Sequence, residues 1–293
     1  MLSEPRRFKQ VDVFTSVPFK GNPLAVVLGA DGLRDDDMHA VARWTNLSET
    51  TFALAPLSPE ADYRVRIFSP GAEFPFAGHP TLGTAHALLE AGLQPKTPGR
   101  LVQECGVGLV HIKIAADGSL AFKAPEAQLE ALHEAMYPAL RAALQSDAFH
   151  PNPIVATMGI SWLVVRMDSA DACLALKPNA EALLEFTRKG ITGIAMFAPH
   201  PANGPADYEV RAIFTKLDVL TEDPVTGSAN ACIARVLQAQ GFPDGERTSH
   251  GYSARQGTLL QCDGRVVVTY AEGAPWIGGH SVTVIDGTIR MAS

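Results

Sequence analysis

The sequence predicts an α+β protein made of two pseudo-symmetric halves, each a curved mixed or antiparallel sheet wrapped around one central buried helix. Three observations predict this architecture. Short features recur in the same order about 145 residues apart, which is typical of an internal duplication. Two helical segments are small and apolar nearly all round, so both need burial on most faces. Short alternating segments bounded by Gly, Pro and Asp-Gly surround these helices and are typical of strands and turns.

The repeat rests on three pairs of segments at offsets of 145, 144 and 146 residues. The pairs are residues 63–66 (YRVR) with 208–211 (YEVR), residues 79–87 with 223–231, and Asp117-Gly118 with Asp263-Gly264. The second pair aligns without a gap and shares one Pro, one Gly and two Ala. This alignment places His79 opposite Asp223, so we interpret these two residues as equivalent positions of the two halves.

In the N-terminal half, alternating segments predict six strands around two helices. The first helix begins at Asp35 and places Met38, Val41 and Trp44 at helical spacing. The second covers residues 80–91, followed by Gly92 as its stop signal. The expected strands are residues 8–15, 23–28, 50–55, 63–69, 108–115 and 119–124, the last two joined by a hairpin turn at Asp117-Gly118.

The C-terminal half opens with residues 126–145, which are charged, Ala-rich and amphipathic and predict an exposed connecting helix bent at Pro138. The central helix is expected over residues 225–239. Asp263-Gly264 and Asp286-Gly287 predict hairpin turns near the end. Strands are expected at residues 154–157, 161–167, 193–198 and 208–214. We therefore expect two domains, residues 1–125 and 126–293, and leave open that the extreme C-terminal segment packs on the first domain.

The composition of the chain limits the kinds of partner that it can bind. The 293 residues are 46% hydrophobic and 19% charged, with a net charge of -7, so the chain folds and has no basic surface for nucleic acid or a membrane. No apolar run reaches the length of a membrane span, and the N-terminus does not look like a signal peptide. Four widely spaced cysteines predict neither disulfides nor a metal site. We expect a cytoplasmic protein, without a metal, that binds a small molecule.

The two central helices suggest where that molecule binds. Each has a Pro in its first turn preceded by a polar residue, His79 or Asp223. The unpaired N–H groups and the positive end of the helix dipole favour a carboxylate or phosphate at such a helix start. If a pseudo-twofold axis relates the halves, two helix starts would face one cleft.

Structural alternatives exist for each candidate residue. Asp223 before a proline is also typical of an N-cap, and Ser228 could bond only to its own helix backbone. Glu49 could complete a capping box with Asn46, although the β-branched pair and Phe that follow favour a strand starting there. His79 is the hardest to explain structurally, because His is a poor cap.

Several segments together resemble one known family, the PhzF-like (phenazine biosynthesis protein-like) isomerases, which have the diaminopimelate epimerase fold. The segments span most of the chain in the family's order. They are Asp12-Val13-Phe14 with GNPLAV at 21–26, NLSETTF at 46–52, EFPFAGHPTLG at 73–83 and EDPVTGSA at 222–229.

This resemblance implies a two-domain enzyme with its site between the halves, commonly a homodimer, with no cofactor and no metal. It identifies Glu49 as the acid/base residue and His79, Asp223 and Ser228 as polar residues around the substrate. Substrate contacts are also expected from Asn22, Ser48, Gly78 and Gly227, the two glycines through their backbone.

The leading hypothesis is a cofactor-independent isomerase in which Glu49 moves a proton on a small carboxylate-bearing substrate. An alternative is an amino-acid-type epimerase or racemase that pairs Glu49 with a partner other than cysteine, such as Asp223 or His79. Racemases of this fold use two thiols, but here the nearest cysteine, Cys232, lies well inside the second central helix. A third possibility is a small-molecule-binding protein without turnover.

Overall fold

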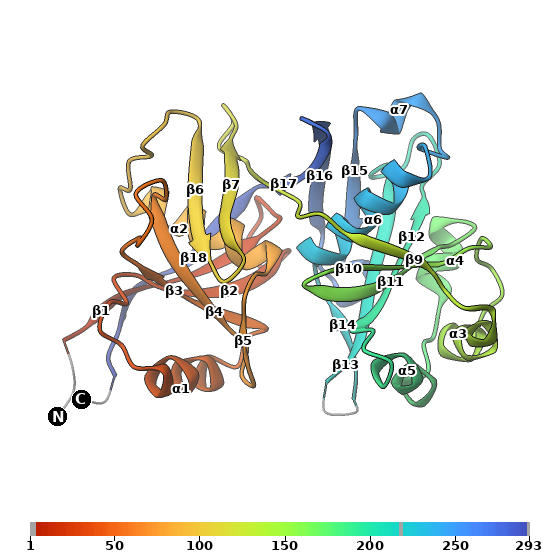
Figure 1. The fold of residues 1–293 in the computed structure, drawn as a ribbon, viewed down its shortest axis with the longest axis horizontal. Helices are drawn as coiled ribbons and strands as arrows, with labels where there is room; N and C mark the ends of the chain where they lie inside the picture. Colours follow the sequence, from red (N-terminus) through yellow and green to blue (C-terminus); the bar gives the residue numbers. More distant parts are fainter. Residues whose placement is uncertain (1–3, 217–218, 292–293) are drawn as a thin grey trace. The chain divides into compact units, whose positions relative to one another are not determined.

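The structure is a computed structural model that describes residues 4–216 and 219–291. Two compact units divide the chain (Figure 1). Unit 1 comprises Met1–Lys123 and Gly278–Ser293, and unit 2 comprises Ala124–Ile277. The predicted α+β class is confirmed, because each unit combines a mixed sheet with a buried helix. Within the described residues, no helix has the length and apolar character needed to span a bilayer.

The strands of unit 1 form a mixed sheet around helix α2 (Gly78–Glu90). Two strand pairs, β2/β3 and β4/β6, are parallel, and the remaining neighbours are antiparallel. Helix α2 packs against β1, β2, β3, β8 and β18. The strands are β1 (Arg6–Val13), β2 (Asn22–Val27), β3 (Glu49–Leu54), β4 (Tyr63–Phe68), β5 (Glu73–Phe74), β6 (Arg100–Cys105), β7 (Gly108–Ile114), β8 (Leu120–Lys123) and β18 (Ser281–Ile289).

Unit 2 repeats this series of strand partners around helix α6 (Gly227–Ala239). Here β11/β12 and β13/β15 are the parallel pairs, and the other neighbours are antiparallel. Its strands are β9 (Gln128–Ala131), β10 (Ile154–Met158), β11 (Ile160–Arg166), β12 (Gly193–Pro199), β13 (Tyr208–Lys216), β14 (Val219–Asp223), β15 (Gly251–Gln256) and β16 (Gly264–Ala271); β17 (Ala274–Gly279) crosses the boundary between the units.

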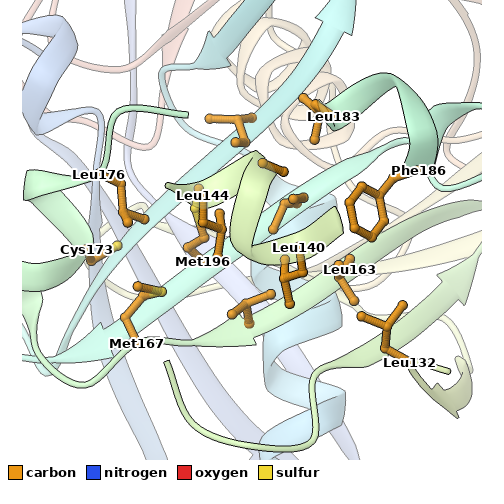
Figure 2. Packing of buried hydrophobic residues seen from close by; sticks show 14 of the residues in the cluster. Leu132, Leu140, Leu144, Leu163, Met167, Cys173, Leu176, Leu183, Phe186 and Met196 are labelled. Carbon is orange, nitrogen blue, oxygen red and sulfur yellow. The ribbon is translucent and has the colours of Figure 1, made fainter. Parts of the chain in front are cut away.

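The remaining helices cover the sheets unequally. In unit 1, α1 (Asp35–Thr45) packs on β3 and β4, with Met38 and Val41 against Phe52 and Phe68. Unit 2 carries α3 (Tyr137–Leu144), α4 (Ala170–Ala175), α5 (Ala180–Thr187) and the short α7 (Glu246–Ser249). Figure 2 shows the core that α3, α4 and α5 form with the sheet, including Leu140, Leu163, Phe186 and Met196. These side chains are almost completely removed from water, so this core is a main source of the stability of unit 2.

Two predicted elements are wrong, the bent helix over residues 126–145 and the turn at Asp286-Gly287. Residues 126–145 are not one helix, because Gln128–Ala131 pairs with β10 as strand β9 and α3 begins only at Tyr137. Pro138 lies in the first turn of α3 and does not bend a helix, since a proline there sacrifices no helical hydrogen bond. Asp286-Gly287 forms no turn, because it lies inside β18 and pairs with β1.

Two further differences concern side chains and helix bounds. Trp44, expected on the buried face of α1 with Met38 and Val41, is 78% exposed. Both central helices begin at a glycine that was not predicted as the first residue. Helix α2 begins at Gly78, two residues before its predicted start, and helix α6 begins at Gly227, two residues after its predicted start. Pro224, expected in the first turn of the second central helix, therefore lies outside α6 and before its N-cap.

Candidate active site

Glu49 is the first residue of β3 and follows a tight turn from α1. Asn46 ends α1 in the left-handed conformation, with φ of 53°, so the capping-box alternative for Asn46 and Glu49 is wrong. The Glu49 side chain is only 17% exposed, while neighbouring Ser48 is exposed. The strand thus presents a carboxylate that is largely shielded from solvent but still reachable.

His79 is the second residue of α2, and its imidazole lies beside that carboxylate. Nε2 of His79 is 3.3 Å from Oε2 of Glu49, and Nδ1 of His79 is 3.5 Å from Nδ2 of Asn22. Burial lowers the pKa of His79 from 6.5 to about 3, so the ring is neutral at pH 7. When Asn22 donates to Nδ1, the single ring proton is on Nε2, the ring nitrogen that lies beside Glu49.

Asn22 is fully buried at the start of β2 and is held there by the preceding loop. The Asp12 carboxylate accepts hydrogen bonds from the backbone N–H groups of Lys20 and Gly21. A Cβ atom at position 21 would collide with the backbone oxygen of Val13, which explains why this position is a glycine. The GNP segment therefore delivers the amide of Asn22 to the imidazole of His79.

Asp223 lies at the start of the other central helix, but it is not its N-cap. Asp223 is the last residue of β14, and Thr226 is the N-cap of α6. The Thr226 hydroxyl donates a hydrogen bond of 2.6 Å to Oδ2 of Asp223 and does not cap the helix. The carboxylate is thereby tied to the turn that leads into α6.

Ser228 is the second residue of α6, directly after the buried Gly227. Its Oγ accepts a hydrogen bond of 3.1 Å from the indole Nε1 of Trp162, a buried residue of β11. An indole N–H can only donate, so Ser228 Oγ uses a lone pair for Trp162 and has its own proton left to donate. The alternative in which Ser228 bonds only to its own helix backbone therefore does not account for its hydrogen bond with Trp162.

The structure corrects the register of the repeat. Helices α2 and α6 both contain 13 residues and begin at positions 78 and 227, an offset of 149 and not 144. The segment Glu73–His79 (EFPFAGH) then corresponds to Glu222–Ser228 (EDPVTGS). This register makes Ser228, not Asp223, the counterpart of His79, and it puts Phe74 at the place of Asp223.

An arginine–glutamate pair supports the corrected register. Arg66 donates through Nε to Oε1 and through Nη2 to Oε2 of Glu73. Arg211 donates through the same two atoms to the same two oxygens of Glu222. The arginines are 145 residues apart and the glutamates 149, so unit 2 has four extra residues between Arg211 of β13 and Glu222 of β14. A gapless alignment could not include this insertion.

Glu49 has no acidic counterpart in unit 2. The antiparallel registers of β3 with β4 and of β12 with β13 make Gly193, the first residue of β12, its equivalent. A Cβ atom on Gly193 would lie 2.8 Å from the Trp162 ring. Where unit 1 pairs a carboxylate with His79, unit 2 therefore pairs an indole with Ser228.

The structure thus gathers Glu49, His79 and Asn22 within unit 1, with Ser48 and Gly78 adjoining them in sequence, and Asp223, Gly227 and Ser228 within unit 2. The expected cleft between the halves stays a prediction. Two buried residues around these groups, Trp162 and Gln256, were not predicted as site residues. Strand β15, which carries Gln256, was not predicted, so the polar residue at its end was not noticed.

The two fully buried cysteines, Cys173 and Cys232, do not contribute to this site as thiolates. Cys232 is the sixth residue of α6 and fully buried, and burial raises its pKa to about 12. Burial raises the pKa of Cys173 similarly. Among the described residues, no group of three or more His, Cys, Asp or Glu side chains is arranged to hold a metal ion.

Comparison with known proteins gives consistent matches. The family described as phenazine biosynthesis-like protein matches residues 11–287. Antisense-enhancing sequence 1 of Schizosaccharomyces pombe is 35% identical over 296 residues, covering 96% of this chain and 97% of that protein. The trans-2,3-dihydro-3-hydroxyanthranilate isomerase of Pseudomonas fluorescens is 34% identical over 290 residues, covering 96% and 98%.

Solved structures agree on the fold. A PhzF-family phenazine biosynthesis protein from Bacillus anthracis matches with a TM-score of 0.81 at 26% identity, covering 98% of this chain and 99% of that chain. A hydroxyproline epimerase from Agrobacterium vitis matches with a TM-score of 0.64 at 13% identity, covering 99% and 92%, which shows a likeness of fold alone.

Proposed function

The chain is an isomerase that belongs to the phenazine biosynthesis-like family, and on that premise we propose that Glu49 moves a proton on a small carboxylate-bearing substrate without a cofactor. The observation that carries the proposal is the pairing of Glu49 with a neutral, buried His79. In this reaction the carboxylate takes a proton from one carbon of a conjugated system and returns it to another carbon.

The surroundings of Glu49 and His79 indicate which of the two residues transfers the proton. A histidine whose pKa is lowered to about 3 is a weak base, so His79 does not compete with Glu49 for the substrate proton at neutral pH. Its neutral ring instead restricts the positions open to the Glu49 side chain, because Nε2 lies 3.3 Å from Oε2. Glu49 is partly exposed, so the proton it carries can exchange with water between the two steps, and a product formed in heavy water then contains deuterium.

The substrate anion needs hydrogen-bond donors. The backbone N–H groups of Gly78 and His79 lie in the first turn of α2, where the helix dipole favours negative charge. Gly227 and Ser228 have the same positions in α6. We assign these groups, with Asn22, Ser48 and Asp223, to substrate contacts, as the family resemblance predicts. The N–H and O–H donors among them stabilise the delocalised anion that forms when the proton is removed, whereas the Asp223 carboxylate can only accept.

A two-base epimerase or racemase is less well supported. Such enzymes need a proton carrier on each face of one carbon, and the place equivalent to Glu49 in unit 2 is Gly193. Asp223 is the remaining acidic candidate, and its carboxylate already accepts a hydrogen bond from Thr226. The single glutamate therefore favours an isomerase in which one group performs both proton transfers.

Incubation of the wild-type protein with trans-2,3-dihydro-3-hydroxyanthranilate in heavy water, followed by NMR, tests the proposal. This compound is the first candidate because relatives at 34% identity are named for its isomerisation. We expect deuterium at a carbon different from the one that loses hydrogen. Exchange at a single stereocentre with inversion would identify an epimerase. If this compound and a panel of related unsaturated carboxylates are all recovered unchanged and unlabelled, the proposal is wrong.

A further inference from the structure

Gln256 is the last residue of β15, and its side chain is fully buried next to the start of α6. A primary amide carries two N–H donors and one oxygen that can accept two hydrogen bonds. Leaving any of them without a partner in the interior would be costly. The partners of this amide are therefore informative about what it does.

The amide makes four hydrogen bonds around the turn before α6. Its Oε1 accepts from the backbone N–H of Thr226 and from Nδ2 of Asn230, both at 3.0 Å. Its Nε2 donates to the backbone oxygen of Asp223 at 3.1 Å and to Oγ1 of Thr226 at 2.9 Å. A backbone N–H can only donate and a carbonyl oxygen can only accept, so these two partners fix the orientation of the amide.

The fixed amide determines the direction of the next bond. Oγ1 of Thr226 accepts from Gln256, so its single proton is available for Oδ2 of Asp223, 2.6 Å away. A directed chain therefore runs from Gln256 through Thr226 to Asp223. Each member orients the following one, and the chain ends on a carboxylate oxygen.

We propose that Gln256 is a positioning residue that acts through the Thr226 hydroxyl to hold the Asp223 carboxylate in one orientation, as a hydrogen-bond acceptor. The inference rests on the proposed function, in which Asp223 contacts the substrate. The carboxylate would then be oriented before the substrate binds and could accept a hydrogen bond from an N–H or O–H donor of the substrate.

Unit 1 supplies a matched control. Gln103 of β6 is also fully buried and donates to Oγ1 of Thr81 at 3.0 Å while it accepts from the Tyr63 hydroxyl at 3.0 Å. Thr81 then donates to the backbone oxygen of Ala77 at 2.9 Å. This chain ends on a backbone carbonyl, so removing Gln103 tests the structural cost of losing a buried glutamine without touching a carboxylate.

Three variants separate positioning from stability. Thr226→Val keeps the shape of the side chain and removes only the hydroxyl, Gln256→Leu removes the amide, and Gln103→Leu is the control. The first readout needs no substrate: it is the 13Cγ NMR signal of Asp223 at pH 7, assigned by its disappearance in Asp223→Asn. We expect the signal to move in Thr226→Val and Gln256→Leu and to stay in place in Gln103→Leu.

The second readout is kcat/KM for deuterium incorporation. We expect about a tenfold loss in Thr226→Val and Gln256→Leu, the effect of losing one hydrogen bond to a charged group, and less than about a twofold loss in Gln103→Leu. An unmoved Asp223 signal in Thr226→Val would overturn the inference, even if Gln256→Leu does not fold. A moved signal in a protein that turns over no candidate substrate would leave the positioning intact and reject the proposed function instead.

Discussion

The starts of helices α2 and α6 share a similar set of surrounding residues, which we call the frame of each helix start, but they carry different chemical groups. Both follow a Glu-x-Pro-x-x-Gly segment, both are tied to a neighbouring strand by a buried glutamine, and both lie near a bidentate arginine–glutamate pair. Unit 1 adds the Glu49 carboxylate and His79 to this frame. Unit 2 has Gly193 and Ser228 at the same places and adds Asp223 where unit 1 has Phe74. The frame therefore positions side chains in both units, and the side chains differ in the chemistry that they can do.

The largest expected difference between the two frames concerns the arginine–glutamate pairs. Arg211 and Glu222 are 4% and 13% exposed, whereas Arg66 and Glu73 are 25% and 39% exposed. Arg211 also donates to two backbone oxygens at the end of α4. Arg211→Met strands a buried carboxylate and should lower the free energy of unfolding by about 3–5 kcal/mol. Arg66→Met should cost less than about 1 kcal/mol. Urea denaturation measures both, and equal losses would show that the two frames are energetically alike.

The next prediction concerns the pH dependence of stability at the two helix starts. The folded-state pKa of His79 is about 3, below its ordinary value of 6.5, so the unfolded chain binds the proton more tightly. The contribution of the neutral ring is complete above pH 6.5 and is lost as the pH falls towards 3. In this range the wild type should lose up to about 1.4 kcal/mol per pH unit more than His79→Gln.

Urea denaturation at a series of pH values checks this, with Ser228→Ala as the matched control. That variant removes the counterpart of His79, which does not titrate, and should follow the pH profile of the wild type. Parallel profiles for the wild type and His79→Gln would contradict the account of a neutral, buried histidine.

The smallest expected effect concerns Trp162. Trp162→Phe keeps a ring over Gly193 but removes the N–H that bonds to Ser228. We expect a loss of about 1 kcal/mol, or about fivefold in kcat/KM for deuterium incorporation. In Ser228→Ala the same Trp162 substitution should have no further effect on catalysis. Independent, multiplying effects of the two substitutions would show that the indole does not act through Ser228.

The elements that sequence could predict are those with a strong local signal. Strands β1–β4, β7 and β8 follow alternating segments, and α2 and α6 follow small apolar runs. The register of the repeat was wrong because Pro and Gly occur twice in the first segment, so a gapless match could place Pro80 and Gly83 where Pro75 and Gly78 belong. The four extra residues between Arg211 of β13 and Glu222 of β14 also shift the register, and only the bounds of the elements reveal them.

Within the candidate site, the motifs identified Glu49, His79, Asn22, Asp223 and Ser228, but not what surrounds them. Trp162 and Gln256 are 66 and 30 residues away in sequence from the groups they hold. No local pattern links such partners, since folding alone brings them together. The absence of an acidic counterpart to Glu49 is likewise seen only when Gly193 is identified as its equivalent. That identification requires the strand registers.

Glu49→Gln tests the central claim, that one carboxylate at the start of β3 performs the proton transfer, most directly. The variant keeps the size of the side chain and an oxygen for His79 but cannot carry the proton. The measurement compares deuterium incorporation into the isomerised substrate with substrate affinity from calorimetry. We predict that incorporation falls by at least about a hundredfold while affinity changes little. Incorporation at the rate of the wild type in Glu49→Gln would contradict the account.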